Sequence, residues 1–249
     1  MGVVLDKNNN EITVFSTKNE KHIGMLYDLL KESFDPSELE SKEAMIEKTQ
    51  GEQKDNTEFL TYVAFKDGKL VGGYTCLVIK DEKLGNISYI EYIVTHPDER
   101  RNHVATAILQ GGVMSEYKSD AMVDIVDPNK AECETKEEFD NIASKSKFWN
   151  SQRARKLDVK NFQQPDFENE ENIDEGSYLA YIPNNPSSTE IPSEKLSNAL
   201  YKINVVSNGV ENPREKFPKM FEEIDSQETI SISQLPLTME VLPDEDLAQ

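Results

Sequence analysis

The first part of the chain alternates between two patterns of apolar positions, one typical of strands and one typical of helices. Residues 11–16 (EITVFS) alternate polar and apolar side chains as an edge strand does, whereas residues 22–34 place apolar side chains at the spacing of an amphipathic helix. Two β-branched and aromatic runs flank the turn Lys66-Asp67-Gly68, which indicates a hairpin. The predicted elements are a strand at 11–16, helices at 22–34 and 37–49, and hairpin strands at 59–65 and 70–79.

The next stretch predicts further strands and helices in alternation. Residues 87–95 (ISYIEYIVT) form an apolar run that Pro97 ends, because proline has no N–H to donate to a sheet. Apolar side chains then recur at helical spacing from Arg101 to Tyr117. The remaining predicted elements are a strand at 121–126, a helix at 136–149, and strands at 154–162 and 177–182.

The composition changes after Pro183, where the run NNPSSTEIPSEK is rich in Pro, Ser and Asn, as linkers are. We therefore expect a first domain at 1–185 and a C-terminal extension at 186–249. The extension is too short to bury its own core, so it should pack on the first domain, with the final PDEDLAQ disordered. Helices are predicted at 194–206 and 215–224 and a strand at 229–235, and a candidate homodimer surface comprises Leu196, Leu200, Ile203 and Ile232.

Charge and hydropathy exclude several classes of partner. The net charge is −20, from 47 acidic and 27 basic residues, so the protein as a whole repels nucleic acid. No apolar run approaches the length of about 18 residues that a membrane helix needs, and residues 1–10 are polar, unlike an export signal. We therefore expect a cytoplasmic protein with neither a membrane nor a nucleic-acid partner.

The cysteines and histidines predict no metal centre. Cys76 and Cys133 are the only cysteines, too few for a zinc cage or a disulfide framework, so we expect free thiols. His22 and His96 have no cysteine or carboxylate set at metal-ligand spacing around them. We therefore expect no metal.

The segment at 89–109 (YIEYIVTHPDERRNHVATAIL) places a strand, a short turn with two arginines and a helix N-terminus in succession. The first N–H groups of a helix lack intrahelical partners, and together with the helix dipole they attract anions. A pyrophosphate fits such a site. A plain strand-to-helix connection would also carry this pattern, so the segment by itself leaves both interpretations open.

The run from Pro97 to Ala105 resembles the acyl-CoA signature of the GNAT superfamily, a proline followed by Arg-x-x-Gly-x-Gly/Ala. Three later segments, DIVDP (124–128), KFWNSQRARKLDVKNFQQP (147–165) and SYLAYIP (177–183), resemble the late strand, helix and hairpin of a longer GNAT branch. The resemblance covers about residues 11–183. It implies an α/β (α+β) fold with a mixed, mostly antiparallel central sheet flanked by helices, and the predicted order of elements agrees.

The resemblance also implies a reaction, the direct transfer of an acyl group, here acetyl, from acetyl-CoA to a primary amine. Glu91 matches the strand carboxylate that often serves as general base in this family, directly or through water. The alternative for Glu91 is a strand residue without a catalytic role, which pairs with a neighbouring lysine or faces solvent. The residues that would bind CoA are Ile93, Val94, Thr95, Arg100, Arg101, Asn102, His103, Val104 and Ala105.

Two departures from the family pattern concern the same site. His103 replaces the first glycine of the signature, which lets the backbone approach phosphate. Trp149 replaces a tyrosine that protonates the leaving thiolate in many relatives, and an indole N–H cannot do so at neutral pH. Tyr92, Tyr117 or water would then be the donor. Two hypotheses follow, an active N-acetyltransferase and a catalytically weak or inactive module that binds CoA or a protein partner.

The loop at 165–175 holds six acidic residues and no basic one. In GNAT-like folds the corresponding hairpin borders the acceptor cleft, so the loop could recognise a cationic amine on a small molecule or peptide. A solvated loop without a binding role is the alternative.

Overall fold

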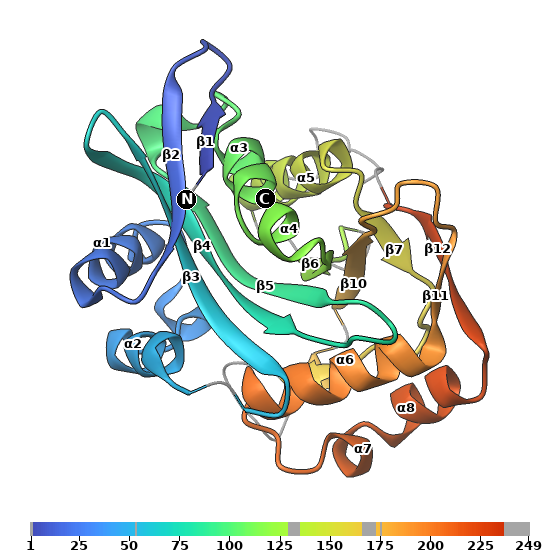
Figure 1. Ribbon diagram of the computed structural model, residues 1–249. Helices are drawn as coiled ribbons and strands as arrows, with labels where there is room; N and C mark the ends of the chain where they lie inside the picture. The colour runs from blue at the N-terminus through green and yellow to red at the C-terminus, as the bar shows by residue number, and fades with distance from the viewer. Residues whose placement is uncertain (1, 53, 129–134, 166–172, 175, 237–249) are drawn as a thin grey trace.

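The computed structural model describes residues 2–52, 54–128, 135–165, 173, 174 and 176–236. Its centre is a ten-stranded sheet in the order β1-β2-β3-β4-β5-β6-β10-β7-β12-β11 (Figure 1). Neighbouring strands are antiparallel apart from β5 and β6, which are parallel. The expected mixed, mostly antiparallel sheet is therefore confirmed. The strands are β1 (Gly2–Leu5), β2 (Glu11–Thr17), β3 (Thr57–Lys66), β4 (Lys69–Ile79), β5 (Ile87–Thr95), β6 (Asp120–Val126), β7 (Arg155–Leu157), β10 (Ser177–Ile182), β11 (Glu190–Pro192) and β12 (Thr229–Gln234), with β8 (Gln164–Pro165) and β9 (Ile173–Asp174) paired separately.

Helices cover both faces of this sheet (Figure 1). Helices α1, α2 and α6 contact β3, β4 or β5 on one face, and α3 lies on the other face against β1 to β5. None of the helices in the described ranges is long and apolar enough to cross a membrane. The helices are α1 (Glu20–Lys31), α2 (Lys42–Gln50), α3 (Val104–Gly111), α4 (Val113–Tyr117), α5 (Lys136–Ser151), α6 (Ser193–Val206), α7 (Pro213–Lys216) and α8 (Pro218–Asp225), with short 3-10 turns at Pro36–Glu38 and Pro97–Glu99.

The C-terminal extension completes the fold of the preceding residues. Strand β12 pairs with β7, so one sheet includes residues from both sides of position 186. The domain boundary near residue 186 stays a prediction. Leu196, Leu200 and Ile203 are at most 3% exposed and pack in one apolar cluster with β4, β5 and β10. The hypothesis that these three side chains form a homodimer surface is therefore wrong, because they already face the interior.

Several predicted elements differ from the observed ones, and local contacts explain two of them. The helix predicted at 101–117 begins at Val104 and breaks at Gly112, where the Val113 N–H donates to the Tyr74 hydroxyl at 2.6 Å and a Cβ atom on residue 112 would clash with that hydroxyl. The helix predicted at 215–224 breaks before Pro218, which has no N–H to donate. The strand predicted at 154–162 is only Arg155–Leu157, and β1 and β11 were not predicted. Cys133, most of the acidic loop and PDEDLAQ lie outside the described residues.

Candidate active site

Strand β5 has one edge that its neighbour leaves open. Its parallel pairing with β6 covers only Ile87–Tyr89, whereas its antiparallel pairing with β4 continues to Thr95. Strand β6 in turn pairs with β10 as far as Val126. The two parallel strands therefore diverge after Tyr89, and backbone groups of Ile93, Val94 and Thr95 that point away from β4 face the gap.

A β-bulge lies at the start of this divergence. Thr75 of β4 is opposite Tyr92 and Cys76 is opposite Ile90, so Glu91 has no partner on β4. Bulges re-aim side chains and are common next to active sites. Ile90 packs with the α3 side of the sheet, whereas Tyr92 packs with the α1 and α2 side. The bulge therefore sends Glu91 towards α2, where it meets Lys48.

Glu91 is a buried carboxylate with few stabilising partners. Its side chain is 8% exposed, and no donor among the described residues makes a hydrogen bond to either oxygen. Burial raises its pKa to about 7, although the Lys48 ammonium lowers it. The Ser207 hydroxyl also lowers the Glu91 pKa, although the two groups do not meet the geometry of a hydrogen bond. A carboxyl with such a pKa is matched to proton transfer near neutral pH.

Lys48 of α2 links Glu91 to a second carboxylate, and we call Glu40, Lys48 and Glu91 the Lys48 cluster. Lys48 Nζ lies 2.9 Å from Glu40 Oε2 and 3.8 Å from Glu91 Oε1. It also donates to the backbone carbonyl of Ser207, 3.4 Å away at the end of α6, and lies over the Phe59 ring. Burial lowers the Lys48 pKa, but the two carboxylates raise it above its ordinary value overall.

The sequence contained no local signal for the partners of Glu91. Lys48 lies on a polar helix, and Glu40 and Ser207 are ordinary surface residue types in loops or at helix ends. Only the packing of α2 and α6 on the same face of the sheet brings them together.

The turn between β5 and α3 has the backbone shape of an anion site. Arg101 (φ 65°) and His103 (φ 61°) are left-handed, and Asn102 between them is not. Successive N–H groups in such alternating conformations can form a concave nest for anions. The Asn102 N–H donates weakly to the Glu99 carbonyl, at 3.4 Å. The helix begins only at Val104, and His103, its N-cap, makes no capping bond with its side chain. The first helical N–H groups therefore belong to Val104, Ala105 and Thr106, later than the sequence predicted.

The conformation of His103 gives a physical reason for the glycine in the family signature. A left-handed residue with a Cβ atom costs about 1–3 kcal/mol, which glycine avoids. Arg100 lies elsewhere, because its guanidinium donates to Ser33 Oγ at 3.2 Å, beyond α1. The structure thus separates the side chain of Arg100 from the backbone nest at Arg101 to His103.

Trp149 and the two tyrosines named as candidate proton donors all have partners in the structure. Trp149 is 5% exposed and packs edge-on against Phe148 in the core, so its indole is a structural group. The Tyr92 hydroxyl donates to the Glu38 carbonyl and that of Tyr117 to Glu58 Oε2. Burial raises the pKa of both phenols, which makes them weaker acids.

The sequence itself identifies the family of this site. Residues 23–132 match the model of the acetyltransferase (GNAT) family, a range that includes β5, the bulge and the nest. Residues 23–132 thus form a GNAT-family acetyltransferase domain. The predictions of this superfamily and of an N-acetyltransferase are thereby confirmed at the level of the family.

A solved structure agrees with a GNAT fold. A putative GNAT-family acetyltransferase from Bacteroides thetaiotaomicron is 20% identical, with a TM-score of 0.57 over 80% of this chain and 99% of that chain. Arabidopsis thaliana Naa50, in complex with the bisubstrate analogue CoA-Ac-MVNAL, is 15% identical over 68% of this chain and 97% of its own, with a TM-score of 0.44. A search of curated proteins found no match. Among the described residues, no three His, Cys, Asp or Glu side chains lie where they could hold a metal ion.

Proposed function

We propose that this GNAT protein transfers an acetyl group from acetyl-CoA directly to a primary amine on a small molecule or peptide. The observation that carries the proposal is the buried bulge carboxylate of Glu91, whose pKa lies near 7 beside a lysine ammonium. Its position agrees with the family match, because the bulge lies at the point where β5 and β6 diverge.

The residues around the gap fit acetyl-CoA. The open edge of β5 at Ile93, Val94 and Thr95 offers backbone groups to an amide-containing arm such as pantetheine. The nest at Arg101 to His103, followed by the N–H groups of Val104 and Ala105, suits a pyrophosphate. Acetyl-CoA supplies the thioester carbonyl and the leaving thiolate of the reaction. Its binding by these residues is part of the proposal.

The surroundings of Lys48 support an amine as the acceptor. Its ammonium is held by two carboxylates, a backbone carbonyl and an aromatic face, which are the groups that bind a primary ammonium. A substrate amine that replaced the Lys48 ammonium would meet the same groups. Lys48 therefore stands in for the reacting group of the acceptor.

Glu91 has a defined task in this reaction. A protonated amine cannot attack a carbonyl carbon, so it must first lose a proton, which Glu91 accepts when it is ionised. The amine nitrogen then forms the new C–N bond while the C–S bond breaks and the thiolate leaves. The products are the acetylated amine, CoA and one proton.

A CoA-binding module without turnover is the second candidate. The observation that favours it is the enclosure of Glu91, since both of its oxygens are buried and Lys48 already fills the neighbouring position. In this alternative the Lys48 cluster is a permanent structural ion pair.

Ligand binding and turnover separate these candidates. Calorimetric titration with acetyl-CoA should give a saturable heat, and millimolar acetyl-CoA should raise the unfolding temperature, because the ligand binds only the folded state. A panel of primary amines is then screened for release of free thiol. Turnover with at least one amine supports the enzyme, whereas binding with no turnover across the panel supports the module. Absence of binding would contradict both.

A further inference from the structure

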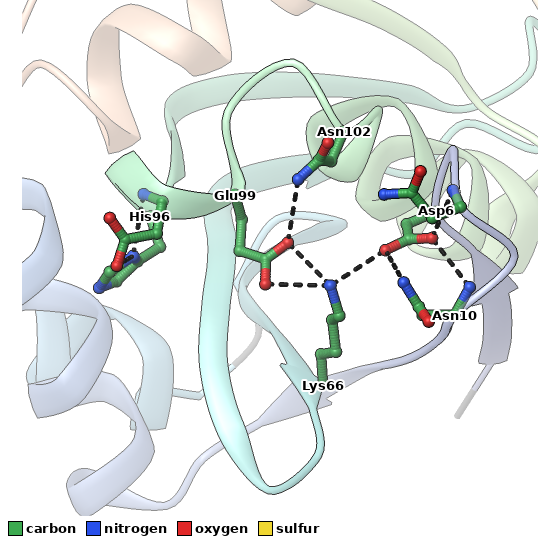
Figure 2. Close-up of polar contacts among 8 residues, drawn as sticks. Asp6, Asn10, Lys66, His96, Glu99 and Asn102 are labelled. Carbon is green, nitrogen blue, oxygen red and sulfur yellow. Dashed lines mark hydrogen bonds and ion pairs between the residues drawn. The ribbon is translucent and has the colours of Figure 1, made fainter.

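A second buried ion cluster lies on the N-terminal side of the nest (Figure 2). Its centre is Lys66 at the end of β3, whose Nζ lies 3.1 Å from Asp6 Oδ2 and 2.9 Å from Glu99 Oε2. We call Asp6, Lys66 and Glu99 the Lys66 cluster. The Asp6 side chain is fully buried and the other two are at most 20% exposed. The cluster joins the turn after β1, the end of β3 and the loop that leads to the nest.

The turn after β1 holds Asp6 rigidly. Its carboxylate accepts hydrogen bonds from the backbone N–H groups of Asn8 and Asn10, each at 2.8 Å, and from the Asn10 side-chain amide at 2.9 Å. The sequence DKNNN supplies these donors, and Asn9 adopts the left-handed conformation that such a turn requires (φ 62°). One end of the cluster is therefore fixed by its own turn.

The other end of the cluster holds the nest. Asn102 donates from its side-chain amide to Glu99 Oε2 at 3.4 Å, and its backbone carbonyl accepts from Lys7 N–H at 3.0 Å. The residues on either side, Arg101 and His103, have a backbone conformation that side chains with a Cβ atom disfavour. Such a conformation persists only where the surroundings over-determine it. The contacts of Asn102 with Lys7 and with Glu99 supply that constraint, and Lys66, itself paired with Asp6, holds Glu99 in place.

We propose that Lys66 is a positioning residue for the pyrophosphate of CoA, and that with Asp6 and Glu99 it holds the backbone of residues 101–103 in an anion-binding shape. The N-terminal hairpin, which precedes the matched family range of 23–132, is then part of the cofactor site. The proposal rests on the proposed function, because it concerns the binding of CoA at this nest.

The test compares two ligands on three lysine variants. Lys66→Met removes the central charge, Lys66→Arg keeps it, and Lys69→Met removes an exposed lysine directly across the same hairpin turn. Calorimetry measures the affinity of each variant for CoA and for S-acetyl-pantetheine, which has the thioester arm but no pyrophosphate. Circular dichroism and the unfolding temperature establish that each variant is folded.

We expect Lys66→Met to weaken the binding of CoA at least about tenfold, the scale of effect when a group that orients a ligand-binding residue is removed. The affinity for S-acetyl-pantetheine should stay within about twofold of the wild type. Lys66→Arg should restore most of the CoA affinity, and Lys69→Met should leave it unchanged. Glu99→Gln, which keeps the shape of the side chain, should also weaken the binding of CoA and leave the affinity for S-acetyl-pantetheine unchanged.

Two outcomes overturn the positioning role while leaving the proposed function intact. One is wild-type CoA affinity in a folded Lys66→Met protein. The other is an equal loss for CoA and S-acetyl-pantetheine, which would show a general structural role. A wild-type protein that binds neither ligand would overturn the proposed function and this proposal together.

Discussion

The Lys48 and Lys66 clusters contain the same kinds of charged group but shift the pKa of their buried carboxylates in opposite directions. Each places one lysine ammonium between two carboxylates, and each contains one carboxylate that is almost or fully buried, Glu91 in the first and Asp6 in the second. Yet the pKa of Glu91 is raised to about 7, whereas that of Asp6 is held well below its ordinary value of 3.8.

Hydrogen-bond donors account for the difference. The Asn10 side chain, the N–H groups of Asn8 and Asn10, and Lys66 all donate to Asp6, and together they outweigh its burial. Glu91 has no hydrogen-bond donor among the described residues, and its lysine is 3.8 Å away, so burial dominates. A buried carboxylate with donors stabilises a conformation, and one without them is available for proton transfer.

The largest effect that would test this contrast is on turnover. Glu91→Gln keeps the shape and removes the base, so acetyl transfer should fall by roughly 10²–10⁴-fold while the affinity for acetyl-CoA stays unchanged. Steady-state kinetics with the amine found in the screen measure both constants. Glu99→Gln in the Lys66 cluster is the matched control, and it should raise the KM for acetyl-CoA while preserving kcat. A loss below about tenfold, with chemistry rate-limiting, would mean that Glu91 is not the base.

The next effect is on the pH dependence of stability. Because the pKa of Glu91 is raised from 4.5 to about 7 on folding, the wild type should lose stability relative to Glu91→Gln as pH rises between these values. The difference should reach the order of 3 kcal/mol and stay constant above about pH 7. Urea unfolding at pH 4.5, 6 and 8 measures it.

Asp6→Asn should show the opposite sign. The lowered pKa of Asp6 stabilises the fold above the ordinary value of 3.8, and this contribution is lost as pH falls through the lowered pKa. The deficit of Asp6→Asn should therefore be full at pH 7 and shrink in acid. If the stability differences of Glu91→Gln and Asp6→Asn from the wild type changed with pH in the same direction, the two carboxylates would not have opposite pKa shifts.

A smaller effect concerns the coupling of Lys48 to Glu91. Lys48→Met removes the cation that lowers the Glu91 pKa, so the pH midpoint of kcat/KM should rise above 7, by about one unit or more. At pH 7 a rise of one unit lowers the ionised fraction of Glu91, and with it kcat/KM, by about fivefold. Rate measurements from pH 6 to 9 test it, with Lys66→Met as the control that leaves the midpoint in place. An unshifted midpoint in Lys48→Met would show that the titrating group is not Glu91.

The smallest effect concerns the strain in the nest. His103→Gly removes a left-handed residue with a Cβ atom, which should favour the bound backbone by about 1 kcal/mol and tighten CoA severalfold. Calorimetry at pH 5.5 and pH 8 measures the affinity. Weaker binding in the variant, together with weaker wild-type binding at the higher pH, would instead assign a phosphate contact to the imidazolium.

Local patterns were sufficient for the order of most elements and for the part of the chain that forms the site. The apolar run at 87–95 has the observed bounds of β5, and the turn after it follows from Pro97 and the arginines. The spacing of apolar residues and the turn-forming residues did not reveal the helix break at Gly112. This break depends on Tyr74, a residue that lies 38 positions earlier in the chain. Nor did they reveal β1, which ends one residue before Asp6, whose side chain contacts Lys66.

The sequence by itself determined that Glu91 lies on a central strand before the turn into α3, because hydrophobic period, proline and turn chemistry are local properties. Only the tertiary structure decided that Lys48 and Ser207 meet Glu91 and that Asp6 and Lys66 hold the nest. The physical reason is that a pKa depends on burial and on the donors within a few ångströms. Both are set by the packing of segments that are distant in the chain.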